Sequence, residues 1–240
     1  MTESLHTLVA ELQAHVADTD SAYTRNYKSG VRTHPIPFFG DLPSARIVTV
    51  GLNPSATEFE GRGWPRALDA TALTDRLLRY FDGTPHSWFA RWEDALALIG
   101  ASYRVDAAHL DVSSRATTSA GSVPDRALFE RMLIADLPWM VRFLREATSV
   151  RLLMIAGTAT QRYYLNAFLR KYLPPSEARL EGSLSRPPGR GKVLHHTLAL
   201  GSRRIPTYFC SASPSDRRDP GLLAERVGHD AVLLNRWLTD

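Results

Sequence analysis

The sequence has little cysteine and no long apolar run, and both absences exclude whole classes of protein. Its 240 residues include one cysteine, Cys210, which cannot form an internal disulfide, an iron–sulfur site or a zinc site built from cysteines. So little cysteine is typical of a reducing compartment. No apolar run is long enough to cross a bilayer, and the N-terminal segment lacks the core of a signal peptide. We therefore expect a cytoplasmic protein with no membrane partner.

The charge balance is mildly basic, and the composition is that of a globular protein. Lys and Arg number 29 against 25 Asp and Glu, a formal net charge of +4. Such a balance favours a polyanionic partner such as a nucleic acid without requiring one. The length fits one sizeable domain or at most two small ones. We expect a single domain over residues 1–240, with an N-terminal helix and connector at 1–44, and a monomer without metal or cofactor.

Short apolar runs alternate with helical patterns along the chain. The runs predict strands at 45–51, 103–112, 151–157, 193–200 and 204–210, and the helical patterns lie at 4–17, 71–82, 87–99, 124–147, 158–173 and 221–238. Pro138 predicts a break or bend in the fourth helix, and Thr158 is a candidate N-cap of the fifth. The alternation predicts an α/β fold, a three-layer α/β/α sandwich around a mostly parallel, four-stranded central sheet.

Polar loops follow three of these strands. They begin after Val50, after Leu110 and after Cys210. In open α/β sheets, ligands bind at the carboxyl ends of the strands. The sequence therefore predicts a functional site built from these three loops.

Four short motifs occur in a fixed order at the predicted strand ends. They are "VTVGLNPS" after the first strand, "HLDVSS" after the second, "LLMIAGTAT" at the third and "FCSASPSD" after the last. In this order the chain, over residues 35–238, resembles the uracil-DNA glycosylase superfamily, and most closely its thymine- and mismatch-specific branch, whose first motif is G-x-N-P. The resemblance implies an enzyme that flips a base out of DNA and hydrolyses its N-glycosidic bond. No lysine accompanies the motifs as a Schiff-base nucleophile, which favours a monofunctional, hydrolytic enzyme.

The first motif supplies two candidate residues. In the resemblance, Asn53 positions the water that attacks the anomeric carbon. Ser55 lies near C5 of the flipped base, where classical uracil enzymes have a bulky aromatic side chain, so substituents at C5 would have room. Both residues have a simpler alternative, since Asn, Pro and Ser are common in turns and either side chain could cap one.

The second motif departs from the uracil enzymes at Asp111, where they carry an asparagine. An ionised carboxylate only accepts hydrogen bonds, so it would repel O4 of uracil and accept from the exocyclic amine of cytosine. The alternative is that Asp111 caps residues 113–116 or pairs with Arg115. His109 would face the same side of the strand, although a lone strand histidine is more often structural.

The last motif has Ser211 where the hydrolytic uracil enzymes have histidine. The mismatch-specific branch also lacks that histidine. Backbone N–H groups and the Ser211 hydroxyl would then stabilise the negative charge on the departing base. Ser213 matches a phosphate-binding serine of the family.

The loop after this motif is expected to enter the duplex. It contains Ser215, Arg217 and Arg218, and either arginine could fill the gap left by the flipped base and bind phosphate. Lys192, in the basic segment 186–192, could extend the phosphate contacts. The alternative is that these charged segments are simply solvated.

A flipped base also needs an aromatic platform. Phe59 and Trp64 follow the first motif, and Phe38 and Phe39 precede its strand. Aromatic residues are more often part of the core, so only one of these four needs to stack on the base. We favour Trp64 for that role.

Taken together, Asp111 and Ser55 predict a cytosine-derived base with a substituent at C5. Hydroxymethylcytosine or glucosyl-hydroxymethylcytosine of phage DNA fits both residues and would make this an antiviral defence enzyme. A repair glycosylase for uracil, mismatched thymine or a deaminated base is one alternative. A catalytically inactive DNA- or nucleotide-binding relative is another, although Gly157-Thr158 lacks the lysine of a Walker loop.

Overall fold

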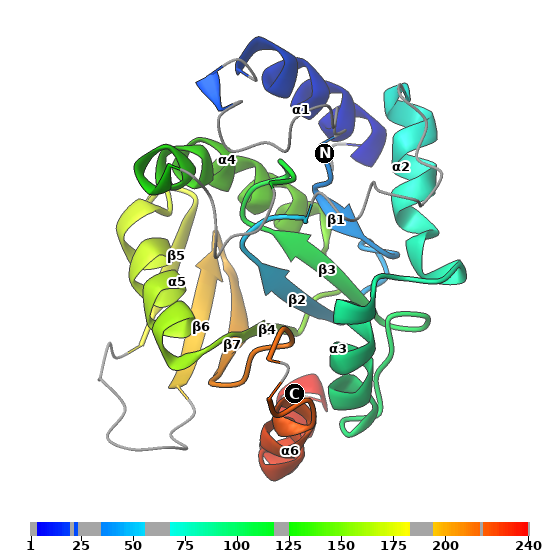
Figure 1. Ribbon diagram of the computed structural model, residues 1–240, viewed down its shortest axis with the longest axis vertical. Coiled ribbons are helices and arrows are strands. Elements are labelled where there is room, and N and C mark those ends of the chain that lie inside the picture. The colour runs from blue at the N-terminus through cyan, green and yellow to red at the C-terminus, as the bar shows by residue number, and fades with distance from the viewer. Residues whose placement is uncertain are drawn as a thin grey trace.

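A computed structural model describes residues 4–19, 22–23, 35–55, 68–117, 125–182, 194–216 and 218–239. In this part of the chain, seven strands form one mixed sheet and seven α-helices surround it (Figure 1). The α/β class predicted from the sequence is confirmed. None of the helices described is long and apolar enough to span a membrane.

The centre of the sheet is parallel and its margins are antiparallel. The strands are β1 (Phe38–Phe39), β2 (Ile47–Gly51), β3 (Ala107–Asp111), β4 (Leu152–Ala156), β5 (Ala178–Glu181), β6 (Leu194–Leu200) and β7 (Arg203–Cys210). Their order is β1-β3-β2-β4-β7-β6-β5. Strands β3, β2, β4 and β7 are mutually parallel, whereas β1, β6 and β5 pair antiparallel.

The prediction of a four-stranded sheet was wrong in number, because it covers only the parallel centre. Three of the seven strands lie outside that centre: β6, whose segment 193–200 was predicted as a strand, and β1 and β5, which were not predicted. β1 has two residues in a segment whose prolines at 35, 37 and 43 indicate a connector, and β5 has four residues. Such short strands carry too little alternation to be recognised, and they form because a neighbouring strand offers its free edge.

The helices are α1 (Leu5–Thr19), α2 (Ala70–Leu78), α3 (Ser87–Ala97), α4 (Arg126–Glu146), α5 (Ala159–Tyr172), α6 (Leu222–His229) and α7 (Ala231–Thr239), with a 3₁₀ turn, η4, at Tyr80–Asp82. Of the break or bend expected at Pro138, the break does not occur, because α4 continues through this residue. Leu137, Met140 and Val141 beside it are buried in the core. The last predicted helix is two helices that meet at Asp230. Thr158 caps α5 as predicted, in a reciprocal capping box with Gln161.

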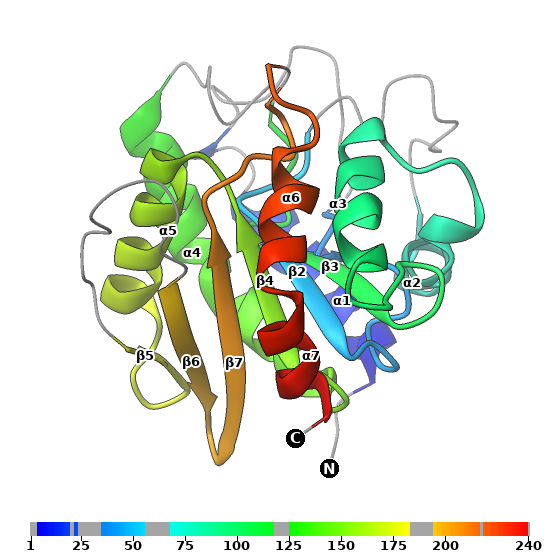
Figure 2. The same ribbon diagram turned by 90° about the horizontal axis from the view of Figure 1, so that it is seen from below.

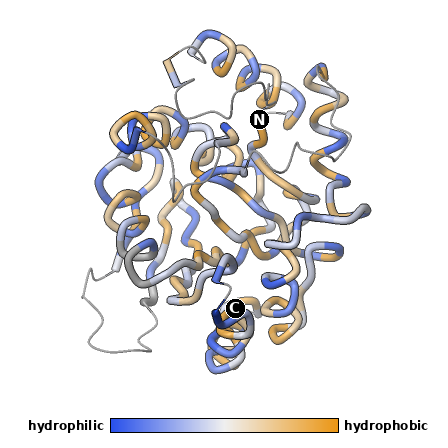
Figure 3. The backbone as a smooth tube through the Cα atoms, in the orientation of Figure 1, coloured by the Kyte–Doolittle hydropathy of each residue, from blue (hydrophilic) through white to orange (hydrophobic). Residues whose placement is uncertain are grey.

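Helices pack on both faces of the sheet. Met140 of α4 and Leu169 of α5 lie over Val50 of β2 on one face. On the other face, Phe89 of α3 packs on His109 of β3, and Tyr208 of β7 bonds to the C-cap of α6. Figure 2 shows α4 and α5 on one side of the central strands and α3, α6 and α7 on the other. In Figure 3, apolar and polar stretches alternate along the helices, as expected for helices with one buried side.

Candidate active site at the carboxyl ends of the central strands

Four strand ends lie at one edge of the sheet. Because β3, β2, β4 and β7 are parallel, their last residues, Asp111, Gly51, Ala156 and Cys210, share that edge. The structure therefore brings together the loops that carry the predicted motifs. Neighbouring strands are about 4.8 Å apart, so the end of β3 lies roughly 14 Å from the end of β7. The loop after β7 lies at the top of Figure 2.

The loops after β2 and β3 run side by side beyond the strands. Three backbone hydrogen bonds join them, from the N–H of Val112 to the carbonyl of Gly51 (3.1 Å), of Ser113 to Leu52 (3.0 Å) and of Thr117 to Pro54 (3.2 Å). Ser55 is half-buried and forms a parallel bridge with Thr117. The parallel pairing thus continues past the sheet and fixes the first and second motifs relative to each other.

The side chain of Asn53 lies between these two loops. Its Nδ2 donates to the Thr117 hydroxyl (2.8 Å), the Arg115 carbonyl (3.1 Å) and the Pro54 carbonyl (3.0 Å). Carbonyl oxygens only accept, so the amide nitrogen must lie on this side and Oδ1 on the other. No residue in the described part of the chain donates to Oδ1. The Asn53 side chain therefore stabilises the turn, which is the simpler alternative to a catalytic role. Its oxygen is at the same time oriented as an acceptor.

Asp111 is a buried carboxylate that accepts no close hydrogen bond from the described residues. Its side chain is 4% exposed, and its polar contact is His109 Nε2, 3.4 Å from Oδ1, which is longer than a good hydrogen bond. Arg115 bonds to Asp136 and not to Asp111. The N–H groups of Ser113 and Arg115, which Asp111 was expected to cap, bond instead to the Leu52 carbonyl and the Ser113 hydroxyl. Buried acceptors nearly always have a donor. This carboxylate therefore keeps the capacity to accept a hydrogen bond from a group outside the described residues.

Gly51 makes the space in which Asp111 lies. A Cβ at position 51 would be 2.3 Å from Asp111 Oδ1 and 3.1 Å from His109 Nε2. Any side chain there would displace the carboxylate. Gly51 of the first motif thus leaves the space that Asp111 of the second motif occupies, and the two residues are directly opposite in the strand register.

His109 belongs to a buried hydrogen-bonded chain. Its Nδ1 is 2.8 Å from Thr49 Oγ1, which is 2.7 Å from the Tyr103 hydroxyl. Burial, as the largest cause, raises the pKa of Tyr103 well above 10.0, so its phenol stays protonated. His109 therefore has the buried, bonded environment of a structural histidine and also faces Asp111. Sequence reasoning missed Thr49 and Tyr103, because Thr49 is in an apolar strand and Tyr103 is in a turn before β3.

Three aromatic rings surround His109. Trp88, Phe89 and Phe39 have centroids 5.0, 5.3 and 5.9 Å from the imidazole. Phe39 is core, and so is Phe38 beside it. The favoured Trp64 and also Phe59 lie outside the described residues. Trp88 is half-buried in the first turn of α3, and no motif in the sequence indicates it.

The loop after β7 is a compact turn fixed to α3. The Ser213 hydroxyl accepts from the N–H of Ser215 (3.2 Å), and Asp216 Oδ1 accepts from the N–H of Arg218 (2.9 Å). Arg91 of α3 donates to the Asp216 carbonyl. The loop holds an exposed Ser215 and Arg218 beyond the half-buried Ser213.

The remaining residues predicted for this end of the site divide into two groups. Ser211 directly follows Cys210, half-buried, at the carboxyl end of β7. Arg217 and Lys192 lie outside the described residues. The strand after Lys192, β6, begins with Leu194 opposite Phe209, which is at the same end of β7.

A buried ion pair between Arg115 and Asp136 holds the loop after β3 in place. Arg115 Nε is 3.0 Å from Asp136 Oδ2, and both side chains are 1% exposed. The Ser113 hydroxyl donates to the same carboxylate at 2.6 Å, and Arg115 Nη2 donates to the Thr19 hydroxyl at 2.5 Å. The loop is thereby connected to both α1 and α4. Arg115 and Asp136 are distant in sequence, so no local pattern indicated the pair.

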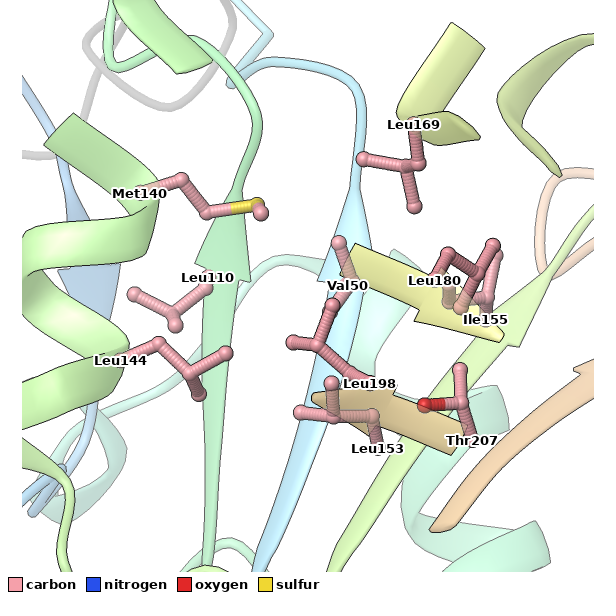
Figure 4. A pocket seen from close by; sticks show the side chains of 10 residues that line it. All are labelled: Val50, Leu110, Met140, Leu144, Leu153, Ile155, Leu169, Leu180, Leu198 and Thr207. Atoms are coloured by element: carbon pink, nitrogen blue, oxygen red, sulfur yellow. The ribbon is translucent and has the colours of Figure 1, made fainter. Parts of the chain in front are cut away.

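An apolar pocket also lies near the central strands, between the sheet and helices α4 and α5 (Figure 4). Its lining is aliphatic except for Met140 and Thr207. Val50 and Leu110 point into it, whereas Thr49 and His109, their neighbours along the strands, point to the opposite face. The pocket therefore belongs to the core and not to the site.

Among the residues described, no group of three His, Cys, Asp or Glu side chains could hold a metal ion. No protein-family model matches the chain, and no curated protein matches it either.

Proposed function

We propose that this protein is a monofunctional DNA glycosylase that recognises its flipped base through Asp111. One observation carries the proposal. A carboxylate 4% exposed, with one long polar contact at 3.4 Å among the described residues, lies at the end of β3, and β3 pairs with the strand that leads to Asn53. Burying an ion without partners is costly, and functional sites are where such a cost persists. The resemblance in the four motifs names the reaction.

Asn53 would hold the attacking water. Its Nδ2 has three acceptors in the protein, so Oδ1 can accept a hydrogen bond from water and aim a lone pair of that water at the sugar. A neutral amide orients water but is a poor base. The chemistry therefore depends on a base that leaves readily from an oxocarbenium-like sugar, as in other glycoside hydrolysis.

The departing base would be stabilised from the end of β7. Ser211 and nearby backbone N–H groups are donors that can face the charge developing on the base. Ser213, Ser215 and Arg218 would contact the flanking phosphates, with Arg217 and Lys192 as further candidates. The distance of roughly 14 Å across the four strand ends suits a nucleotide with its base at β3 and its phosphate at β7.

Asp111 and Ser55 would together select the base. The carboxylate accepts from the exocyclic amine of a cytosine-type base and repels the O4 of a uracil-type base. Ser55 leaves room for a substituent at C5. The target is then a C5-modified cytosine, such as hydroxymethyl- or glucosyl-hydroxymethylcytosine of phage DNA, and the role is cytoplasmic antiviral defence by a monomer. The four parallel strands with helices on both faces support the three-layer sandwich expected for this superfamily.

Base release from defined duplexes tests the proposal. Duplexes carrying one uracil, thymine mismatch, cytosine, hydroxymethylcytosine or glucosyl-hydroxymethylcytosine are incubated with the protein, and abasic sites are revealed with alkali. We expect release of a modified cytosine, lost in Asn53→Ala, and a shift toward uracil in Asp111→Asn. Release of uracil alone would overturn the target. Salt-dependent DNA binding without release of any base would make the protein an inactive relative.

A further inference from the structure

Asp111 has an ion-pair contact with His109, and His109 is itself held by a hydrogen-bonded chain. We infer that Tyr103 and Thr49 fix His109 as the tautomer with its proton on Nε2, facing Asp111, and that His109 is a positioning residue for the base-recognition carboxylate. This inference rests on the proposed function for its effect on specificity. The geometry of the hydrogen-bonded chain does not depend on that function.

The first link runs from Tyr103 to Thr49. The Tyr103 side chain is buried, and its hydroxyl lies 2.7 Å from Thr49 Oγ1. No other group in the described part of the chain bonds to that hydroxyl. A buried phenol that keeps its proton must donate it, because a buried O–H left without an acceptor is costly. Tyr103 therefore donates and Thr49 Oγ1 accepts.

The second link runs from Thr49 to His109. The Thr49 hydroxyl has one proton to give, and two acceptors lie near it. His109 Nδ1 is at 2.8 Å and the Ala108 carbonyl is at 3.4 Å. The 2.8 Å contact is much the stronger of the two, and we assign the hydroxyl proton to it, so that Nδ1 accepts and the imidazole carries its proton on Nε2.

The third link joins His109 to Asp111. Nε2 lies 3.4 Å from Asp111 Oδ1, and the ring is enclosed by Trp88, Phe89 and Phe39 at 5.0–5.9 Å, so it has little freedom to turn. The N–H dipole thus points at one carboxylate oxygen. That oxygen is held toward His109 and Gly51, and Oδ2 is left to accept from the base.

The orientation has a consequence for specificity. With the N–H of His109 directed at Oδ1, the carboxylate presents Oδ2 as an acceptor to the base. Without that N–H, the carboxylate could turn away from the base and would no longer hold an acceptor against the O4 of a uracil-type base. Discrimination between the two base types therefore depends on the donor at position 109 as well as on the carboxylate.

Two substitutions separate the donor from the bulk of the ring. In the His109→Gln variant, the amide nitrogen of the new side chain lies near the place of Nε2 and can still donate toward Asp111. In His109→Asn, the shorter side chain can contact Thr49 but does not reach Asp111. Exposed His229, changed to Asn, is the matched control.

The test combines spectroscopy and kinetics. In ¹⁵N NMR of the folded wild-type protein, we expect Nδ1 of His109 to be unprotonated and Nε2 to carry the proton. The ratio of kcat/KM on a modified cytosine to kcat/KM on uracil should fall about tenfold in His109→Asn. Loss of an orienting partner in metal sites costs about 10–100-fold, so this is the low end of that range. His109→Gln should retain most of the ratio, and His229→Asn should not change it.

The outcomes separate the two proposals. A proton on Nδ1 would contradict the hydrogen-bonded chain from Tyr103 to Asp111. Equal discrimination between the two bases in His109→Gln and His109→Asn would contradict the positioning role of His109. Absence of base release by the wild type defeats the glycosylase proposal, while the NMR result still decides the hydrogen-bonded chain. Should a variant fail to fold, Thr49→Val and the wild-type spectrum decide, because Thr49→Val removes the donor to Nδ1 and should change the tautomer ratio.

Discussion

Asp111 Oδ1 lies 2.3 Å from the point where a Cβ of Gly51 would be. The two residues are opposite each other in the parallel pairing of β2 and β3. This contact connects the first and second motifs, because the carboxylate can lie at the strand end only where the neighbouring strand ends in glycine. The glycine is required here by close approach rather than by its backbone angles.

Gly51→Ala should therefore move the carboxylate. The added methyl group has no space unless Asp111 turns away, so we expect a clear loss of preference for cytosine-type bases and a loss of about 1–3 kcal/mol in the free energy of unfolding. Urea denaturation and the base-release ratio measure the two effects. At Gly83, a Cβ would meet only the Tyr80 carbonyl at 3.9 Å, so Gly83→Ala is the control. An unchanged ratio in Gly51→Ala would show that Asp111 does not select the base.

Asp111 and Asp136 are both buried carboxylates, and we predict opposite effects when each becomes asparagine. Asp136 pairs with Arg115, so Asp136→Asn leaves a buried cation without its partner and should cost about 3–5 kcal/mol. The donor that we infer for Asp111, His109 Nε2, is 3.4 Å away, so Asp111→Asn removes a buried charge that is only weakly paired and should stabilise by about 1 kcal/mol, or about 2–4 °C in Tm. Thermal unfolding of both variants measures this. A large destabilisation by Asp111→Asn would indicate a structural role.

Asn53 allows a test with two substitutions. Asn53→Asp faces the Arg115 and Pro54 carbonyls with an acceptor in place of a donor, so we expect a loss of about 1–3 kcal/mol in stability. Asn53→Ala should reduce kcat for base release about 10²-fold through loss of water positioning, with little change in KM. Single-turnover kinetics separates the two parameters. Unchanged kcat in Asn53→Ala would assign this residue to the turn alone.

The pKa of Tyr103 predicts how stability depends on pH. Burial raises it well above the ordinary 10.0, so the unfolded chain ionises at a lower pH than the folded protein. The stability that the protonated Tyr103 contributes to the folded state is fully present below pH 10, and it is lost as the pH rises above 10 toward the pKa of the folded protein. Between pH 9 and 11, the wild type should therefore lose stability more steeply than Tyr103→Phe in urea titrations. Parallel curves would mean that Tyr103 ionises freely in the folded protein.

The edge that carries the site could be predicted from the sequence, because parallel strands and polar loops after them leave one place for a ligand. The motif residues Asn53, Asp111 and Ser211 do lie there. The short strands β1 and β5 could not be predicted, since their pairing partner and not their own pattern makes them strands.

The supports of the site could not be predicted for a different reason. Arg115 and Asp136 are on a loop and a helix, and their pairing depends on how α4 lies against the sheet. Thr49 and Tyr103 meet His109 only because the β2–β3 register places Thr49 opposite it. Such contacts depend on register and on the packing of distant segments, which a single sequence does not encode locally.

The central claim is that Asp111 selects a cytosine-type base, and one measurement tests it most directly. Base release by the wild type and by Asp111→Asn is compared on duplexes that differ only in carrying hydroxymethylcytosine, glucosyl-hydroxymethylcytosine or uracil. We predict that the wild type releases a modified cytosine and that Asp111→Asn shifts release toward uracil. Release of uracil alone by the wild type, or identical preferences in the two proteins, would contradict the account.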